Sequence, residues 1–316
     1  MKIDQVADLG SRIVAAVGQA VVGKDEVLRQ VLMGLLADGH VLIEDYPGVA
    51  KTLIAQSFAQ AMELCFKRIQ FTPDLLPGDI TGGYIYNQRE AAFEFRPGPI
   101  FTNLLLADEI NRATPKTQAA LLEGMQEKQV TVEGERFSLE KPFIVIATQN
   151  PIEFEGTYPL PEAQLDRFIM SLGIGYPRPE DELEMLRRRG DRKSDAVNLP
   201  TIVDGPKFLE MQRAEEEVYV SEDIGKYMVS IVGETRRDSK VQVGASPRGT
   251  LALFKMARAA AALTGRDFVT PEDAKSVSVQ ALAHRIMLRP ELWATQTPAR
   301  DVIENILKRV LAPRSE

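Results

Sequence analysis

An apolar segment that runs directly into a glycine-containing turn and then into a helix constrains this fold more than any other feature. His40–Glu44 has the apolar centre of a buried strand, Asp45–Ala50 contains Pro and Gly, and Lys51–Met62 has helical character. The first N–H groups of such a helix point toward the turn, where the helix dipole favours negative charge. The sequence therefore predicts a strand–turn–helix unit whose turn can hold a phosphate.

Further apolar segments extend this pattern. Lys67–Phe71, Phe101–Ala107 and Phe143–Thr148 are predicted strands, and the last two are nearly uninterrupted apolar runs, typical of strands buried on both faces. Helices are predicted before the first strand, at about residues 4–17 and at Lys24–Ala37. Alternation of strands and helices predicts an α/β fold, with a parallel sheet flanked by helices.

Two segments alternate aromatic and polar residues around a polar turn, which is typical of a β-hairpin. The first is Gly82–Gly98, and the second is Gln129–Leu139, which turns at Glu133-Gly134. We expect two inserted β-hairpins, at about residues 82–98 and 129–139, that protrude from the α/β region.

The pattern changes after Tyr176-Pro-Arg-Pro-Glu180, where helical segments follow one another to the end of the sequence. The length of 316 residues also favours two domains. We therefore expect an α/β domain over residues 1–178 and an all-helical C-terminal lid domain over residues 179–316. The predicted helices are Glu180–Arg189, Lys207–Glu216, Glu222–Ser239, Pro247–Thr264, Pro271–Arg285 and Pro298–Leu311.

Composition excludes several classes of protein. Hydrophobic residues at 44% and charged residues at 26% are ordinary globular values, and no apolar run is long enough for a membrane span. The single cysteine, Cys65, cannot form an internal disulfide, and the N-terminus lacks the apolar core of a signal peptide, so we expect a cytoplasmic protein. The net charge of −7 disfavours a surface dedicated to nucleic acid.

The turn of the first unit resembles a P-loop only in part. Lys51 can supply a positive charge to phosphates and Thr52 a hydroxyl to Mg²⁺. The general pattern has glycine where this chain has Asp45 and Ala50, so only Gly48 remains as a glycine in the loop. An ordinary strand-to-helix turn with a capping lysine is the alternative.

Polar side chains follow the next two predicted strands. Asp108 and Glu109 end one strand, where one carboxylate can hold the Mg²⁺ shell and its neighbour can polarise an attacking water. Asn150 follows the other strand and can orient that water, since ligands of such sheets bind beyond the carboxyl ends of the strands. The alternatives are a solvated acidic turn and an Asn-Pro turn residue.

Two arginines are candidates for contacts with phosphate. Arg167 follows Asp166, so a local ion pair is the alternative. Arg248 lies in the first turn of a predicted helix, where the dipole disfavours a cation, and this placement suggests a bound phosphate. The basic run Arg187–Arg189 is interpreted as a solvated helix end rather than a nucleic-acid patch.

Taken together, five segments in order resemble motifs of the MoxR group of AAA+ ATPases. The departures at Asp45 and Ala50 are then departures from the general P-loop pattern and not from this family. The segments resemble, in order, Walker A at Asp45–Thr52, Walker B at Ala107–Ala113, sensor 1 at Ala147–Pro151, the arginine-finger segment at Leu160–Phe168 and the start of the sensor 2 helix at Gly244–Arg248.

The resemblance implies a role for each candidate residue. Glu109 would be the catalytic base, Asn150 sensor 1, Arg167 a finger that acts on a neighbouring subunit's ATP, and Arg248 sensor 2 from the lid. Thr52 and Asp108 would hold Mg²⁺. Val21, Val22 and Gly23 resemble the segment that packs on adenine, with an inter-helix turn as the alternative. The implied nucleotide-binding residues are Val21, Val22, Gly23, Pro47, Gly48, Val49, Ala50, Lys51, Thr52 and Leu53.

The resemblance also implies a biological role and partners. It implies a hexameric ring that couples ATP hydrolysis to chaperone-like remodelling, maturation or metal-cofactor loading of partner proteins, with a von Willebrand factor A domain protein among them. The two hairpins would be the helix 2 insert and the pre-sensor 1 hairpin, which point toward the pore. A nucleic-acid motor and a nucleotide-gated scaffold with little turnover are the alternatives. The acidic net charge disfavours the motor, and the acids Asp108 and Glu109 disfavour the scaffold.

Overall fold

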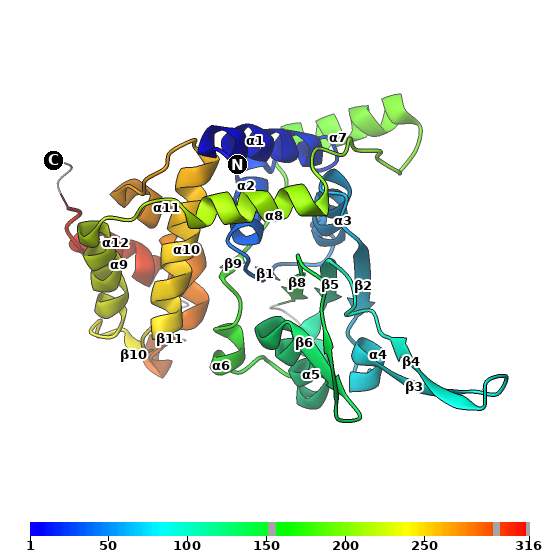
Figure 1. The fold of residues 1–316 in the computed structure, drawn as a ribbon. Coiled ribbons are helices and arrows are strands. Elements are labelled where there is room, and N and C mark those ends of the chain that lie inside the picture. The colour runs from blue at the N-terminus through cyan, green and yellow to red at the C-terminus, as the bar shows by residue number, and fades with distance from the viewer. Residues whose placement is uncertain (151–155, 293–297, 314–316) are drawn as a thin grey trace.

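A five-stranded parallel sheet forms the centre of the protein, whose computed structural model describes residues 1–150, 156–292 and 298–313. The strand order is β2-β5-β8-β1-β9, and every neighbouring pair is parallel (Figure 1). The predicted α/β fold is confirmed. The strands are β1 (Val41–Glu44), β2 (Phe66–Gln70), β5 (Leu104–Asp108), β8 (Ile144–Gln149) and β9 (Met170–Leu172).

The uninterrupted apolar character of β5 and β8 follows from burial on both faces. Successive residues of a strand point to opposite faces. Leu104 and Leu106 accordingly belong to one hydrophobic core, whereas Leu105 and Ala107 belong to a second core on the other face. The edge strand β9 was missed, because a three-residue strand next to a turn has too few residues to show a pattern.

Helices cover both faces of the sheet. The larger core contains side chains of α1, α2 and α3 together with side chains of the C-terminal helices, and the smaller core contains side chains of α4 and α5. These helices are α1 (Ile3–Gly18), α2 (Asp25–Leu36), α3 (Lys51–Ala61), α4 (Pro77–Thr81) and α5 (Pro115–Glu127), with the short helices η1 (Ile110–Arg112) and α6 (Glu162–Leu165) near the sheet.

Both predicted hairpins are present. The first pairs β3 (Gly82–Asn87) with β4 (Ala92–Pro97) and extends away from the body, and the second pairs β6 (Gln129–Val132) with β7 (Glu135–Ser138) (Figure 1).

Side-chain contacts join the two hairpins to each other. The rings of Phe95 and Phe137 stack with centroids 4.1 Å apart, and the Tyr84 hydroxyl donates to Glu135 Oε2 at 2.5 Å. Phe101 packs edge-on against both phenylalanines. The two hairpins form separate two-stranded sheets, so these side chains couple them directly.

The C-terminal region is helical, as predicted, with one addition. Val241–Val243 (β10) and Met287–Leu288 (β11) form a short antiparallel pair, which places the apolar Val241 against the lid and ends α9 earlier than expected. The helices are α7 (Pro179–Arg192), α8 (Gly205–Glu216), α9 (Glu222–Thr235), α10 (Pro247–Leu263), α11 (Pro271–Leu282) and α12 (Ala299–Arg309), with the 3-10 helices η2 (Ala283–Arg285) and η3 (Pro290–Leu292).

The two ends of the sequence share one core. Helices α1 and α2 pack against α10 and α8, and a Cβ atom at Gly10 of α1 would lie 2.3 Å from Leu263 of α10. Gln212 of α8 donates to the Leu35 carbonyl at 2.8 Å. The division at residues 178 and 179 stays a prediction. None of the described helices combines the length and the apolar character needed to cross a bilayer.

Candidate functional site

The turn between β1 and α3 has a strained backbone. Gly48 has φ +85°, and Ala50, immediately before α3, has φ +62°. A left-handed conformation costs a residue with a side chain about 1–2 kcal/mol, and such strain is typical of ligand sites. No side chain caps the start of α3, so its first N–H groups are available to an anion.

Lys51 joins this turn to the neighbouring strand. Its Nζ donates to the carbonyl of Asp45, at the start of the turn, and to the carbonyl of Gln149, at the end of β8, at 3.4 Å. The ammonium group therefore lies at the carboxyl edge of the sheet, where β1 and β8 end.

Asp45, which replaces the first glycine of the general pattern, is a structural anchor. Its buried carboxylate accepts the N–H groups of Ile174 and Gly175 through Oδ2, at 2.6 Å each, and that of Tyr46 through Oδ1 at 2.7 Å. The side chain thus fastens the turn to the segment that follows β9, which a glycine could not do.

The Val21–Gly23 segment lies next to that same anchor. Lys24 donates to the carbonyls of Ile174 and Tyr176 at 2.8 and 2.9 Å, and the Tyr176 ring stacks on Tyr46 with centroids 5.7 Å apart. The segment from α1 to α2 is therefore brought beside the turn, as contact with the base of a bound nucleotide would require.

Position 23 requires glycine, because any side chain there would be strained and would clash with Asp181. Its φ is +71°, and a Cβ atom there would lie 2.2 Å from the carboxyl group of Asp181 in α7. Val21 is buried and Val22 is half-buried.

The two acids at the end of β5 share one hydroxyl. Thr148 Oγ1 donates to Asp108 Oδ1 at 2.6 Å and accepts the N–H of Glu109 at 2.8 Å. Thr148 is fully buried, so its hydroxyl fixes both acids rigidly. Glu109 has φ +56°, which turns its side chain out of the strand direction at a cost of about 1–3 kcal/mol.

Neighbouring side chains hold both carboxylates. Arg68 donates to Asp108 Oδ2 through Nε at 3.1 Å and through Nη2 at 2.7 Å. Gln70 and Arg112 donate to Glu109 Oε2 at 2.7 and 3.1 Å. The acidic pair is thus an organised site and not a solvated turn.

The other residues expected near the phosphates are also placed by the structure. Asn150 is buried at the end of β8, two residues beyond Thr148. Thr52 follows Lys51 in α3. The side chains of Val49 and Leu53 pack on the larger core, so these two residues can reach a ligand only through their backbones, whereas Pro47 is exposed.

Arg167 and Arg248 lie at the opposite edge of the sheet. Ile169, two residues after Arg167, donates to the carbonyl of His40 at 2.9 Å, and His40 precedes β1. Both arginines line one cavity of about 340 Å³. The four residues of β1 separate this edge from the Lys51 edge by about 13 Å, at about 3.3 Å per residue.

The cavity is strongly basic. Lys128, Lys255 and Arg285 also line it, together with Asp38 and Asp166. Burial and then the charge of Arg248 lower the pKa of Arg167. Arg167 Nε is buried without a hydrogen-bond partner among the described residues. The arrangement suits an anion that enters from outside.

The local ion pair considered for Arg167 is absent from the described part of the chain. Asp166 instead accepts from Arg285 through Oδ1 and from the Ser246 hydroxyl through Oδ2, at 2.8 Å each. Arg167 is therefore left for another partner.

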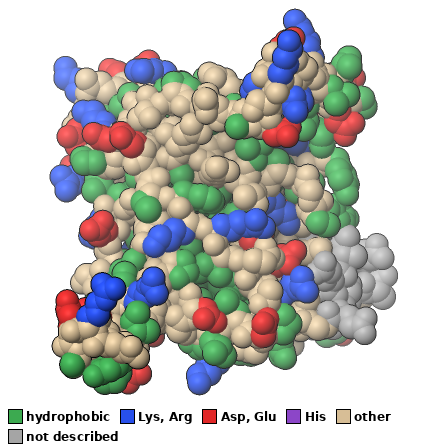
Figure 2. Space-filling model, turned by 90° about the vertical axis from the view of Figure 1, so that its right-hand side faces the viewer, with side chains coloured by type: hydrophobic (Ala, Val, Ile, Leu, Met, Phe, Trp, Pro, Cys, Tyr) green, Lys and Arg blue, Asp and Glu red, His purple; other side chains and the backbone are tan. Residues whose placement is uncertain are grey.

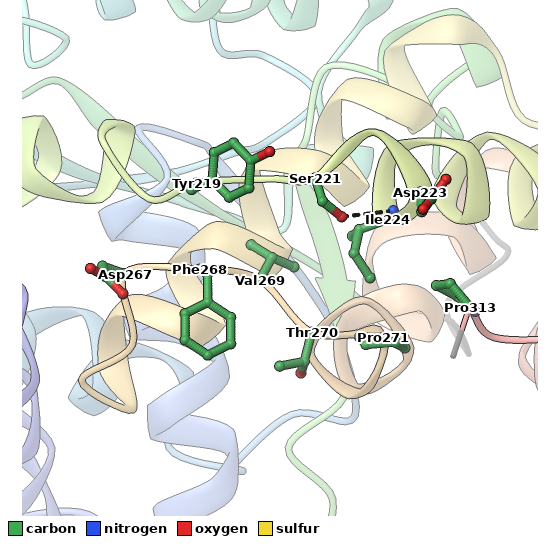
Figure 3. Close-up of a pocket in the computed structure, with 10 residues that line it drawn as sticks. All are labelled: Tyr219, Ser221, Asp223, Ile224, Asp267, Phe268, Val269, Thr270, Pro271 and Pro313. Atoms are coloured by element: carbon green, nitrogen blue, oxygen red, sulfur yellow. Dashed lines mark hydrogen bonds between the residues drawn. The ribbon is translucent and has the colours of Figure 1, made fainter. Parts of the chain in front are cut away.

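A larger cavity of about 820 Å³ lies in the lid, away from all of these residues (Figure 3). The loop before α9, the loop before α11 and Pro313 form its walls, and Tyr219 and Phe268 are exposed there. Its lining carries Asp223 and Asp267 and neither Lys nor Arg, so it would repel phosphates. Size alone does not identify the site.

Several functional contacts were missed in the sequence. The anchor role of Asp45 and the contacts of Arg68 and Gln70 depend on which strands become neighbours, which no local pattern reveals. Thr148 carries one signal, since it is the first polar residue after the apolar run from Phe143 to Ala147. Pro151, the last residue of the Ala147–Pro151 segment, lies outside the described residues.

Comparison with known proteins agrees with this geometry. Residues 40–170 match the family described as "ATPase family associated with various cellular activities (AAA)", and residues 233–306 match the AAA lid domain. The chain is 42% identical to chaperone MoxR1 of Mycobacterium tuberculosis over 312 residues, which cover 96% of this chain and 82% of that protein.

Two further relatives match over nearly their whole length. The uncharacterized protein YeaC of Bacillus subtilis is 46% identical over 302 residues, 96% of this chain and 94% of that protein. The crystal structure of a candidate ATPase from Cytophaga hutchinsonii superposes with a TM-score of 0.92 at 42% identity, over 99% of this chain and 97% of that one. The chain, with its P-loop turn, paired acids and helical lid, belongs to the MoxR family of AAA+ ATPases.

Proposed function

We propose that each ATP is bound at the carboxyl edge of one subunit's sheet and hydrolysed with the help of Arg167 and Arg248 of a neighbouring subunit. The observation that carries this proposal is the separation of the two groups by the length of β1. Because Lys51, Asp108 and Glu109 lie at one edge and both arginines at the other, one subunit cannot bring them to the same phosphate.

Within the bound site, Lys51 and the first N–H groups of α3 would neutralise phosphate charge. Glu109 would act as the base on the attacking water, which Asn150 would orient. Arg167 and Arg248 would stabilise the negative charge that develops on the transferred group, an effect of about 10³–10⁵ in rate for an arginine finger.

The residues present fit Mg²⁺. Mg²⁺ in nucleotide sites is usually held by one or two carboxylates, a hydroxyl and substrate phosphates. Asp108 offers a carboxylate and Thr52 a hydroxyl, and Thr148 already orients one oxygen of Asp108. When bound, the ion would polarise the phosphates and offset part of their negative charge.

A second copy of the chain is the partner that this arrangement requires, and we propose a hexameric ring. Helix α7 projects from the body (Figure 1) and exposes Leu183 and Leu186 by 69% and 72%. Apolar side chains exposed on one helix face are typical of an interface.

For the cellular role we propose remodelling, maturation or metal-cofactor loading of a protein client in the cytoplasm, with a von Willebrand factor A domain protein as a partner. The protruding β3–β4 hairpin supports contact with a client, because Tyr86 and Phe93 near its tip are exposed. Chaperone MoxR1 is one of the relatives.

The structure gives less support to a nucleic-acid motor. On the face shown in Figure 2, Lys and Arg side chains are separated by uncharged and acidic surface and form no continuous band. In the basic run of α7, Arg187 and Arg188 pair with Glu184, and Arg189 pairs with Asp195. Turnover stimulated by DNA would contradict our proposal.

Mixed assemblies test the proposal directly. A Lys51→Ala subunit should fail to bind ATP yet still offer Arg167, whereas an Arg167→Ala subunit should bind ATP without offering a finger. Each alone should be inactive, and mixing them should restore part of the ATPase activity. Mixed assemblies that form, as seen by native mass spectrometry, but stay inactive would show that Arg167 does not act across the interface.

A further inference from the structure

Arg285 is buried in the lid beside the segment that carries Arg167. Its guanidinium donates to Asp166 Oδ1 at 2.8 Å and to the carbonyls of Asp166, Phe168 and Ile169 at 3.2, 2.6 and 3.1 Å. These acceptors span the residues on both sides of Arg167. His284 also contacts the Phe168 carbonyl, at 3.1 Å.

Asp166 also links Arg285 to the start of α10, which is another part of the lid. Its Oδ2 accepts the Ser246 hydroxyl at 2.8 Å, and the same hydroxyl accepts the N–H of Arg248 at 3.1 Å as the N-cap of α10. One carboxylate therefore connects Arg285 of η2, the residue before Arg167, and the turn that carries Arg248.

The hydrogen bonds of Asp166 act against electrostatic repulsion between Arg167 and Arg248. Arg167 and Arg248 line one cavity with Lys128 and Lys255, and like charges in such a site push one another apart. Neither Arg167 nor Arg248 makes an ion pair among the described residues. Their proximity must therefore be imposed by the backbones that carry them.

We propose that Arg285 and Asp166 are positioning residues that hold Arg167 and Arg248 side by side, so that the lid sets the geometry of the finger offered to the neighbouring subunit. The inference rests on the proposed function, because it assigns these residues to the donor side of the shared site. Both residues line the cavity with Arg167 and Arg248, at the edge of the sheet opposite to Lys51.

The role predicts a specific kinetic signature. Loss of the Arg285 contacts should lower kcat by about 10- to 100-fold, the effect of a misplacement of about 1 Å in a catalytic group. The affinity of the same subunit for ATP should not change, since Lys51 and α3 lie at the other edge of the sheet.

The test uses Arg285→Gln in the full chain, measured alone and in mixed assemblies. With Lys51→Ala subunits, which offer an intact Arg285 and finger, ATPase activity should be partly restored. With Arg167→Ala subunits it should not be restored, because both variants lack the same function.

Arg258 provides a matched control within the lid. It is also buried, donates to the Glu215 carbonyl at 2.9 and 3.2 Å and pairs with Glu216 at 2.9 Å. Among the contacts of the described residues, none joins Arg258 to the segment Leu160–Phe168. Arg258→Gln should lower the melting temperature to a similar extent and keep kcat near that of the parent.

Should Arg285→Gln fail to fold, the double variant Arg285→Gln with Asp166→Asn removes both charges and leaves neither buried alone. Wild-type kcat in the folded variant would overturn the inference. The inference would also be overturned if Lys51→Ala subunits restore the activity of Arg167→Ala but not that of Arg285→Gln. If Arg167→Ala is not rescued either, the proposed trans site itself is wrong, which is a distinguishable result.

Discussion

Thr148 and Asp108 are joined by a hydrogen bond of 2.6 Å between neighbouring strands, and the same hydroxyl accepts the N–H of Glu109. Thr148→Val should keep the volume of the side chain and lose both contacts. We expect a loss of about 1–3 kcal/mol in the free energy of unfolding, because a half-buried carboxylate oxygen of Asp108 and the N–H of Glu109 lose their partner. ATPase activity should fall as well, and Thr148→Ser, which keeps the hydroxyl, should retain most of it.

The adjacent acids should respond differently to neutral replacements. Glu109→Gln should bind ATP with Mg²⁺ and hydrolyse it slowly, with several kcal/mol added to the barrier, since the proposed base is lost. Asp108→Asn should instead raise the Mg²⁺ concentration needed for half-maximal activity. Titration calorimetry and phosphate release measure the two effects. Near-normal turnover of Glu109→Gln would show that Glu109 is not the catalytic base.

Asp45→Gly should damage the protein, although glycine is the residue of the general P-loop pattern. The N–H groups of Ile174 and Gly175 would lose a charged acceptor. Hydrogen bonds to charged groups contribute about 1.5–3 kcal/mol, so the melting temperature should fall and ATP affinity should weaken. Asp45→Asn keeps one acceptor oxygen and should be milder. A stable, tightly binding glycine variant would contradict the anchor role.

His40 should contribute to loss of stability in acid. Its Nδ1 accepts from the Val145 N–H and its Nε2 donates to the Met125 carbonyl, so the buried ring is neutral. Burial and then the charge of Lys128 lower its pKa to about 3. A depressed folded pKa means that the stability present above pH 6.5 is lost as pH falls toward 3, by up to about 1.4 kcal/mol per pH unit.

The variant His40→Gln isolates this contribution. In denaturant unfolding between pH 4.5 and pH 8, the free energy of unfolding of this variant should depend less steeply on pH than that of the parent. Part of the dependence should remain, because His284 is buried and its pKa is lowered in the same direction. An unchanged slope would mean that His40 does not titrate on unfolding.

The stacked pair Phe95 and Phe137 should couple the two hairpins energetically. A double-mutant cycle with Phe95→Leu and Phe137→Leu should give an interaction of about 0.5–1.5 kcal/mol beyond the single effects. The pair Tyr86→Leu and Phe137→Leu serves as a control, since the Tyr86 ring packs edge-on against Phe93 and not against Phe137. Additive effects for Phe95 and Phe137 would show that the hairpins are independent.

The sequence predicts most of this fold because its signals are local. The buried strands β5 and β8, the hairpins and most helix positions follow from apolar runs, alternation and turn residues within short windows. The boundaries shift where tertiary contacts decide them: α9 ends at Thr235, before the predicted Ser239, because the chain turns to pair β10 with β11.

In the candidate site, too, some residues can be predicted from the local sequence, whereas others depend on tertiary contacts. The local sequence identifies four of the site residues, because they follow a predicted strand directly or after a short turn: Lys51, Thr52, Asp108 and Glu109. The contact of Asp45 with Ile174 joins residues 129 positions apart, and that of Arg285 with Asp166 joins residues 119 apart. Pairings at such separations follow from strand order and from lid packing, and neither is written in any short segment.

The core shared by α1, α2, α8 and α10 limits how this chain can be divided. A fragment that ends at residue 178 would leave the apolar faces of α1 and α2 without α8 and α10, and the remaining fragment would lack their cover in turn. Neither piece should be recovered alone in monodisperse form, whereas co-expressed pieces should associate and reconstitute the ATPase. A protease that nicks the link before α7 should accordingly leave two polypeptides that migrate together until denaturant separates them.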